Sequence, residues 1–318
     1  MLMRHSGRAY APLRSRRPKV SLLVRRIRSN SGETDLKHKP KLGQNFLVDA
    51  AACAAIADAL GDVSGGTVVE IGPGKGAITG ILARRTGRLV AIELDRVLAA
   101  RLRERFAGTA PVVSDRPSIE TDRPLVVSDR PTVEVIEADV LEVDLAVLAR
   151  EGEKLAVVGN LPYYITSDIL LRLFHFHGAI SRAVVMVQRE VADRVAASPG
   201  TRDYGLLSAT AQLYARVEKV MTLPPSAFSP PPEVHSTVLR LTMRPRFAEL
   251  GVEAEGFIGF LKAGFAQKRK TLAKNLRAAG FDAGRVAAAM EAAGIAAMAR
   301  AEEIELERMA GLWRGLKG

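Results

Sequence analysis

Cysteine is almost absent from this sequence, and so are long apolar runs. Cys53 is the only cysteine among 318 residues, which excludes an internal disulfide and any zinc site built from several thiolates. No segment approaches the roughly 20 apolar residues of a membrane-spanning helix, so we expect no membrane association. The hydrophobic share of 47%, with 25% charged residues, is typical of a soluble globular protein. These features fit a reducing cytoplasm.

Acidic residues are absent before Glu33, whereas arginine and lysine are frequent there. Because such a composition cannot bury a core, residues 1–36 are predicted to form a basic, disordered extension. Three interpretations stay open: an RNA-contacting arm, an initiation codon assigned too far upstream, or an organellar transit peptide. The last would place the protein in an organelle instead of the cytoplasm.

The whole chain is basic. Lysine and arginine number 46 against 35 aspartates and glutamates, which gives a net charge of +11. Such a charge favours a polyanionic partner such as a nucleic acid, because binding releases the counterions of the polyanion. From charge alone, a basic protein without such a partner is an equally good interpretation.

Apolar strand patterns alternate with helical patterns along the chain. The predicted strands span residues 67–71, 89–93, 133–137, 155–159 and 182–188. The alternation predicts an α/β fold, with a Rossmann-like parallel sheet covered by helices on both faces. A last strand at 236–241 follows a proline-rich loop, and the sequence is helical beyond about residue 246. We therefore predict a sheet domain over residues 37–245 and a small all-helical C-terminal domain over residues 246–318.

One segment is repeated within the sheet domain. Residues 112–117 recur almost unchanged at 126–131. Two copies are too few for a solenoid, so residues 111–131 are interpreted as a tandem duplication in a surface loop.

Candidate binding groups follow four of the predicted strands. A turn with Gly72, Gly74 and Gly76 comes after the first strand, at a spacing that differs from the dinucleotide fingerprint. Glu93 ends the second strand and can accept hydrogen bonds from both ribose hydroxyls. Asp139 follows the third strand and can accept a hydrogen bond from a nucleoside amine. Asn160 follows the fourth strand. Because parallel strands end at the same edge of a sheet, these groups predict a nucleoside site.

Residues 160–164 are the most informative stretch. The exocyclic amine of adenine is a poor nucleophile, because its lone pair is delocalised into the ring. The side-chain carbonyl of Asn160 and the backbone carbonyl of Leu161, which Pro162 leaves free, can hold the two amine hydrogens and favour attack on a sulfonium methyl. Tyr163 offers a stacking face worth about 1–3 kcal/mol to an extruded base. This chemistry depends on positioning and needs no metal.

These residues together resemble the KsgA/RsmA family of ribosomal RNA adenine dimethyltransferases, from about Lys37 to the C-terminus. The strings that carry the resemblance are residues 42–47, 70–76, 92–95, 160–164, 186–192, 224–228 and 265–272. The resemblance implies a class I S-adenosyl-L-methionine-dependent methyltransferase domain at 37–245 and an RNA-binding helical domain at 246–318.

The resemblance also implies roles for particular residues. It adds Asn45 and Leu47 to a cofactor site that otherwise comprises Gly72, Glu93, Asp139 and Asn160. It places Phe228 opposite Tyr163 as a second stacking platform, although from its sequence context Phe228 is about as readily a core residue. The repeat lengthens the interval before Asp139, which leaves Asp144 as a rival; the position directly after a strand favours Asp139.

The substrate implied by the resemblance is a pair of adjacent adenosines in the 3′-terminal hairpin loop of small-subunit ribosomal RNA, methylated by a monomer within an immature 30S-type particle. Five cations at helical spacing would meet phosphates, although a solvated helix face explains them equally well: Lys268, Arg269, Lys270, Lys274 and Arg277. The alternatives are an Erm-type methyltransferase of large-subunit RNA, a DNA adenine methyltransferase, and a non-catalytic RNA-binding assembly factor.

Overall fold

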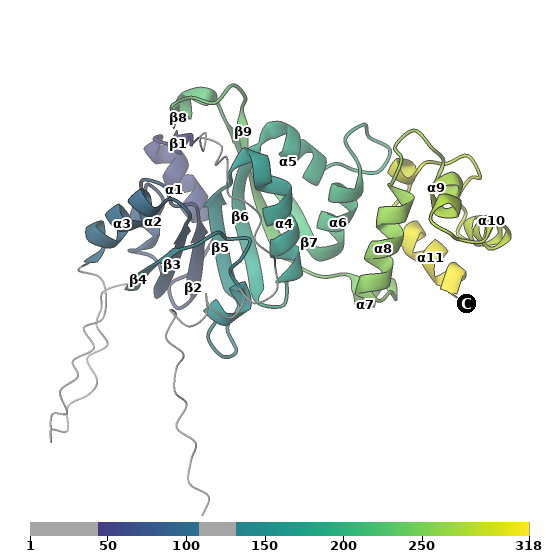
Figure 1. The fold of residues 1–318 in the computed structure, drawn as a ribbon, viewed down its shortest axis with the longest axis horizontal. Helices are drawn as coiled ribbons and strands as arrows, with labels where there is room; N and C mark the ends of the chain where they lie inside the picture. The colour runs from purple at the N-terminus through teal and green to yellow at the C-terminus, as the bar shows by residue number, and fades with distance from the viewer. Residues whose placement is uncertain (1–43, 108–131, 318) are drawn as a thin grey trace, which may run out of the picture. The chain divides into compact units, whose positions relative to one another are not determined.

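A seven-stranded sheet forms the centre of the computed structural model, which describes residues 44–107 and 132–317 (Figure 1). The predicted extension 1–36 and the repeat at 111–131 lie outside the described residues. The strand order is β4-β3-β2-β5-β6-β9-β7. The strands are β2 (Thr67–Ile71), β3 (Arg88–Glu93), β4 (Thr132–Glu137), β5 (Leu155–Asn160), β6 (Ile180–Gln188), β7 (Ala215–Leu223) and β9 (Ser236–Met243).

The first five strands of this order run parallel to one another, as the sequence predicts. Both faces of this part are buried. Successive side chains of a strand point to opposite faces, and every residue of β2 is buried. Val69 and Ile71 of β2 belong to one hydrophobic cluster, whereas Val68 belongs to another. The Rossmann-like fold class is therefore confirmed.

The rest of the sheet differs from the all-parallel prediction. Strand β9 runs antiparallel to both of its neighbours, β6 and β7, so the sheet is mixed. Strand β7 was not predicted, because it lies at the sheet edge, where only its first and last residues are buried and charged residues interrupt its apolar pattern. Two short strands, β1 (Phe46–Leu47) and β8 (Phe228–Ser229), pair separately and were not predicted either.

Helices cover both faces of the sheet. Ile56 of α1 and Leu82 of α2 lie in the cluster of Val68, whereas Leu170 of α4 and Leu213 of α6 lie in the cluster of Val69. The helices of this part are α1 (Ala50–Ala59), α2 (Thr79–Leu82), α3 (Arg96–Arg105), α4 (Thr166–His175), α5 (Arg189–Val195) and α6 (Leu206–Tyr214).

The described chain after β9 is helical, as predicted. It contains α7 (Phe247–Leu250), α8 (Ala254–Gly264), α9 (Leu272–Ala278), α10 (Ala283–Ala292) and α11 (Leu306–Lys317). Phe257 and Phe260 of α8 stack at 5.9 Å, and both belong to the hydrophobic cluster that contains Tyr214 of α6. The terminal helices and one sheet face therefore share a continuous core. Within the described ranges, every helix is too short or too polar to span a membrane.

Candidate active site

The structure brings the four predicted strand-end groups to one edge of the sheet. Gly72 follows β2, Glu93 ends β3, Asp139 follows β4 and Asn160 ends β5. The register makes the ends of these strands neighbours, since Ile71 pairs with both Ile92 and Gly159. This edge is where open α/β sheets bind their ligands.

The glycine turn depends on glycine for its shape and for its contacts. Gly72 and Gly74 have φ angles of +63° and +58°, in the left-handed region that side chains disfavour. A Cβ on Gly74 would lie 3.1 Å from the ring of Phe46. The ammonium of Lys75 lies over the same ring, 4.4 Å from its centroid. Phe46 therefore lies against the turn, a role that the sequence reasoning did not assign although the residue stands between Asn45 and Leu47.

Glu93 is a buried carboxylate held by backbone donors. It is 4% exposed; its Oε2 accepts the N–H of Gly74 at 3.0 Å and its Oε1 that of Asp95 at 2.9 Å. Each carboxylate oxygen has a second lone pair, so both oxygens can still accept a hydroxyl. A buried carboxylate with two spare acceptor positions fits the hydroxyls of the ribose of a nucleoside cofactor.

A second buried carboxyl lies on β2, next to this turn. Glu70 is 2% exposed, and among the described residues neither its Oε2 nor the Thr79 hydroxyl has a hydrogen-bond partner. Burial raises the pKa of Glu70 to about 7; the nearby Thr79 hydroxyl opposes this rise, and the charge of Glu93 adds to it. The group therefore changes its protonation state near neutral pH.

Asp139 and Asp144 have different local roles. Asp139 is half-buried, and its Oδ1 accepts the N–H of Leu141 at 2.8 Å. Asp144 is exposed and caps the short helix η3 (Leu145–Leu148) by accepting the N–H of Ala146 at 2.9 Å. The position after β4 and the partial burial favour Asp139 as the cofactor ligand.

The amide of Asn160 is oriented by the N-terminal segment. Its Nδ2 donates to the backbone carbonyl of Asn45 at 3.0 Å, and its Oδ1 is an acceptor only. The N–H of Leu161 donates to Met186 O at 3.0 Å and fixes the start of the turn. No described residue donates to Asn160 Oδ1 or to the Leu161 carbonyl. Two adjacent residues thus each carry an acceptor without a donor among the described residues; Asn160 is half-buried and Leu161 is buried.

Tyr163 is positioned by a residue that the sequence reasoning missed. Its hydroxyl is hydrogen-bonded to the Ser236 hydroxyl at 2.8 Å, and Ser236 is fully buried at the start of β9. Pro162 precedes the short helix η4 (Tyr163–Ile165) and accepts a hydrogen bond from Thr166 Oγ1 at 2.9 Å. A lone serine 73 residues away carries no sequence signal for this contact.

Phe228 and Leu47 occupy the hydrophobic core. They pair across β1 and β8, with exposed fractions of 4% and 6%, and both lie in the cluster of Val238. The strand pairing thus places the Phe228 side chain in the core, the alternative left open by its sequence context, and its role as a stacking platform stays a prediction. The Leu47 side chain is likewise buried, so its backbone is the part that remains for a cofactor.

The predicted basic face is divided between a turn and a helix. Lys268, Arg269 and Lys270 are exposed in a turn before α9, and only Lys274 and Arg277 lie on the helix. The expected helical spacing is therefore wrong for the first three. The reason is local, since the Thr271 hydroxyl caps α9 and the helix begins only at the next residue.

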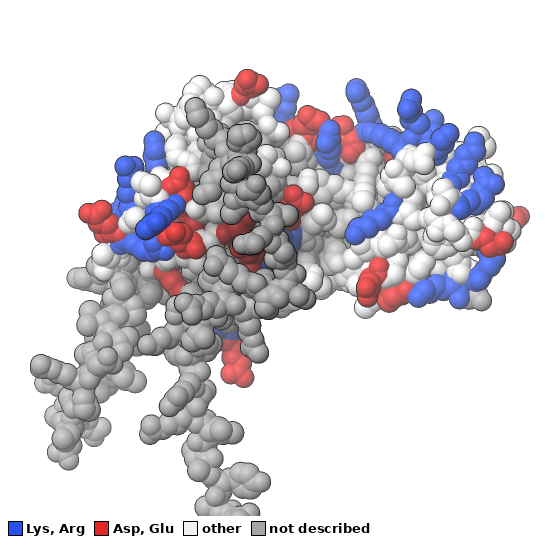
Figure 2. Space-filling model, viewed as in Figure 1, with Lys and Arg blue, Asp and Glu red and all other residues white. Residues whose placement is uncertain are grey.

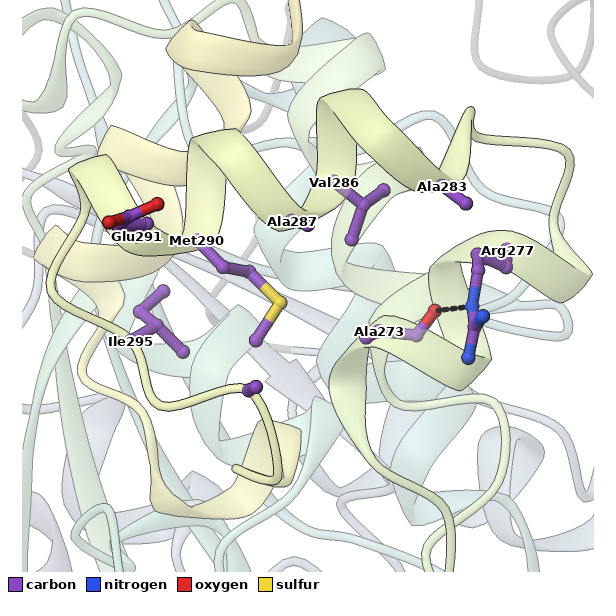
Figure 3. A pocket seen from close by; sticks show the side chains of 9 residues that line it. Ala273, Arg277, Ala283, Val286, Ala287, Met290, Glu291 and Ile295 are labelled. Atoms are coloured by element: carbon purple, nitrogen blue, oxygen red, sulfur yellow. Dashed lines mark hydrogen bonds between the residues drawn. The ribbon is translucent and has the colours of Figure 1, made fainter.

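Arg277 borders a cavity in the C-terminal helices (Figure 3). The cavity has a volume of about 540 Å³ and lies between α9 and α10, with the buried side chains of Val286, Met290 and Ile295 among its lining. Arg277 Nε donates to Ala273 O at 3.3 Å along the same helix. The lining includes no residue of the strand-end site.

Comparisons with known proteins agree on one family. The family model described as ribosomal RNA adenine dimethylase matches residues 35–315. The ribosomal RNA small subunit methyltransferase A of Acidobacterium capsulatum is 64% identical over 88% of this chain and 92% of its own length. The enzyme of the same name from Koribacter versatilis is 53% identical, over 88% and 94%.

Two solved structures share the fold. A dimethyladenosine transferase from Plasmodium falciparum has a TM-score of 0.67 and 21% identity, covering 84% of this chain and 95% of that one. The 23S rRNA methyltransferase ErmE has a TM-score of 0.61 and 27% identity, covering 86% and 100%.

Proposed function

Because this chain belongs to the ribosomal RNA adenine dimethylase family, we propose that it transfers methyl groups from S-adenosyl-L-methionine to the N6 amine of adenine in small-subunit ribosomal RNA. The observation that carries the proposal is the amide of Asn160. Its nitrogen is engaged by Asn45, and neither its oxygen nor the carbonyl of the adjacent Leu161 accepts a hydrogen bond from a described residue.

The strand-end groups would hold the cofactor. When bound, S-adenosyl-L-methionine supplies a methyl group on a sulfonium, which an amine can attack. Glu93 would accept the ribose hydroxyls, the turn at Gly72 allows close backbone approach, and Asp139 would accept a hydrogen bond from the adenine amine of the cofactor. Asn45 covers the same edge through its contact with Asn160.

The turn after β5 would hold the target base. Asn160 Oδ1 and the Leu161 carbonyl can each accept one N6 hydrogen, which disfavours delocalisation of the lone pair into the ring. The ring of Tyr163, fixed at its hydroxyl by Ser236, would be an aromatic platform for the base. The methylated nitrogen is acidic and can lose its proton to water, so no strong base is needed.

The finer substrate assignment is part of the same proposal. The family resemblance supports two adjacent adenosines in the 3′-terminal hairpin loop, modified by a cytoplasmic monomer on an immature 30S-type particle. We assign residues 37–245 to methyl transfer and residues 246–318 to RNA binding. The exposed cations of the C-terminal part support this division: Lys268, Arg269, Lys270, Lys274 and Arg277.

Large-subunit RNA is the second candidate substrate, because ErmE shares the fold at 27% identity. The relatives at 64% and 53% identity are named for the small subunit, which favours the first candidate.

Tritium transfer from labelled cofactor separates these candidates. We expect incorporation into immature small subunits, and none into large subunits or duplex DNA; naked ribosomal RNA shows whether the particle is required. Transfer to large subunits alone would support the ErmE-like alternative. Absence of transfer from any substrate, with RNA binding retained, would indicate a non-catalytic assembly factor.

A further inference from the structure

The loop at residues 198–203, which joins α5 to α6, is attached to the C-terminal helices. Lys268 Nζ donates to the carbonyl of Arg202 at 2.9 Å, and the N–H of Gly200 donates to Glu302 O at 2.8 Å. Figure 1 shows this loop extending from α5 toward the segment between α8 and α9. We call it the bridging loop.

A buried contact holds the C-terminal end of the bridging loop, and a hydrogen bond within the loop holds its shape. Tyr204, directly after it, is 2% exposed and meets the edge of the Phe265 ring at 6.0 Å between ring centroids. Thr201 Oγ1 donates to Ser198 O at 2.7 Å within the loop. The backbone of Arg202 is therefore held in place while its side chain remains exposed.

The cations at this junction form no ion pairs with described residues, although Asp203 directly follows Arg202 and Glu302 contacts the loop through its carbonyl. No described carboxylate forms an ion pair with Arg202, Lys268, Arg269 or Lys270. The cations nearby on α5 and β7 differ, since Arg194 pairs with Glu190 and Lys219 with Asp193. Figure 2 shows lysine and arginine side chains gathered over this part of the surface.

Chain geometry relates this junction to the methyl-transfer site. Strand β6 runs parallel to β5, and Met186 pairs with Asn160. Helix α5 begins at the end of β6, so it starts at the same sheet edge as the turn that follows β5 at Asn160. Its seven residues span about 10 Å before the chain reaches the bridging loop.

We propose that Arg202 binds a phosphate of the RNA substrate and joins Lys268, Arg269 and Lys270 in one surface, the bridge surface, between the methyl-transfer site and α9. A guanidinium on a held backbone suits bidentate phosphate binding. The inference rests on the proposed function, because it takes RNA as the substrate. It extends the RNA-binding residues from the C-terminal helices to the sheet domain.

The dependence of RNA affinity on salt tests this directly. Arg202→Gln is compared with Arg150→Gln, which removes an exposed arginine before β5, at the opposite edge of the sheet from Asn160. Binding of small-subunit RNA is measured over a series of KCl concentrations. We expect Arg202→Gln to lower the slope of log affinity against log salt by about 0.7 to 0.9, and Arg150→Gln to leave it unchanged.

Two further variants keep the test independent of folding. Arg202→Lys retains the charge and should keep most of the slope, whereas Asp203→Asn removes the neighbouring exposed acid and should strengthen RNA binding. For Arg202→Gln the KM for RNA should rise several-fold, with kcat and cofactor affinity unchanged. A wild-type slope and KM for Arg202→Gln, in a protein that does methylate small subunits, would overturn this inference alone. Failure of the wild-type protein to bind or methylate any RNA would overturn it together with the proposed function.

Discussion

The cofactor half and the substrate half of the site are built in different ways. In the cofactor half, Glu93 accepts from Gly74 and Asp95, 19 and 2 residues away in the sequence. In the substrate half, Asn160 depends on Asn45, 115 residues away, and Tyr163 depends on Ser236, 73 residues away. The first half follows from a turn and its neighbouring strand. The second requires β1 and β9 to be in place.

The largest expected effect is that of Asn160→Ala, which removes the oriented acceptor of the substrate half. We expect kcat to fall by about 10³-fold, in line with the loss of one preorganised group at a reacting centre. Cofactor affinity, measured by calorimetry, should change little, because Glu93 remains. Asn160→Asp retains an acceptor but loses the hydrogen bond to Asn45, so its kcat should lie between that of the wild type and that of Asn160→Ala. Substantial turnover by the alanine variant would remove Asn160 from the mechanism.

Glu93→Ala, in contrast to Asn160→Ala, should weaken cofactor binding. Losing charge-assisted hydrogen bonds of about 1.5–3 kcal/mol should weaken cofactor binding by about 10²-fold. Glu93→Gln keeps one carbonyl acceptor and serves as the matched variant, with a smaller loss. Both are read by calorimetry with S-adenosyl-L-methionine. An unchanged affinity would mean that the ribose binds elsewhere.

Glu70→Gln tests whether ionisation of a buried carboxyl destabilises the cofactor half. The pKa of Glu70 is about 7 in the folded protein against a usual value of 4.5, so the folded state holds the proton more tightly than the unfolded state. Its contribution to stability is therefore present at low pH and is lost as the pH rises through 7. The free energy of unfolding should fall by about 2 to 3 kcal/mol between pH 5 and pH 8 on this account.

Urea denaturation at the two pH values measures this difference. Glu70→Gln cannot ionise, so it should lack this part of the decrease. Thr79→Val removes the neighbouring hydroxyl, which lowers the pKa of Glu70, so this variant should keep the pH dependence and shift it to higher pH. Equal decreases in the wild type and in Glu70→Gln would assign the titration to another group.

The smallest effect should come from the bond between Tyr163 and Ser236. Ser236→Ala and Tyr163→Phe should each lower kcat/KM by about three- to tenfold, because each removes one hydrogen bond of about 1 kcal/mol. Since both remove the same bond, the double variant should resemble either single variant. Fully additive losses would show that the two hydroxyls act separately.

The parallel half of the sheet could be predicted from the sequence because its strands are short, apolar runs separated by helices. The same signal was too weak for β7, an edge strand of which only the first and last residues are buried. The basic run at Lys268 illustrates a different limit. Its composition was evident, but the cap at Thr271 decides which of its cations are helical.

Local sequence patterns determined the strand ends that carry Gly72, Glu93, Asp139 and Asn160, since strand periodicity and glycine turns depend on neighbouring residues. Tertiary structure decided the rest. Only folding brings Asn45 to Asn160 and Ser236 to Tyr163, and only the pairing of β1 with β8 places Phe228 in the core. Such contacts join residues far apart in the chain, so no local pattern encodes them, and they arise from the packing of the whole sheet.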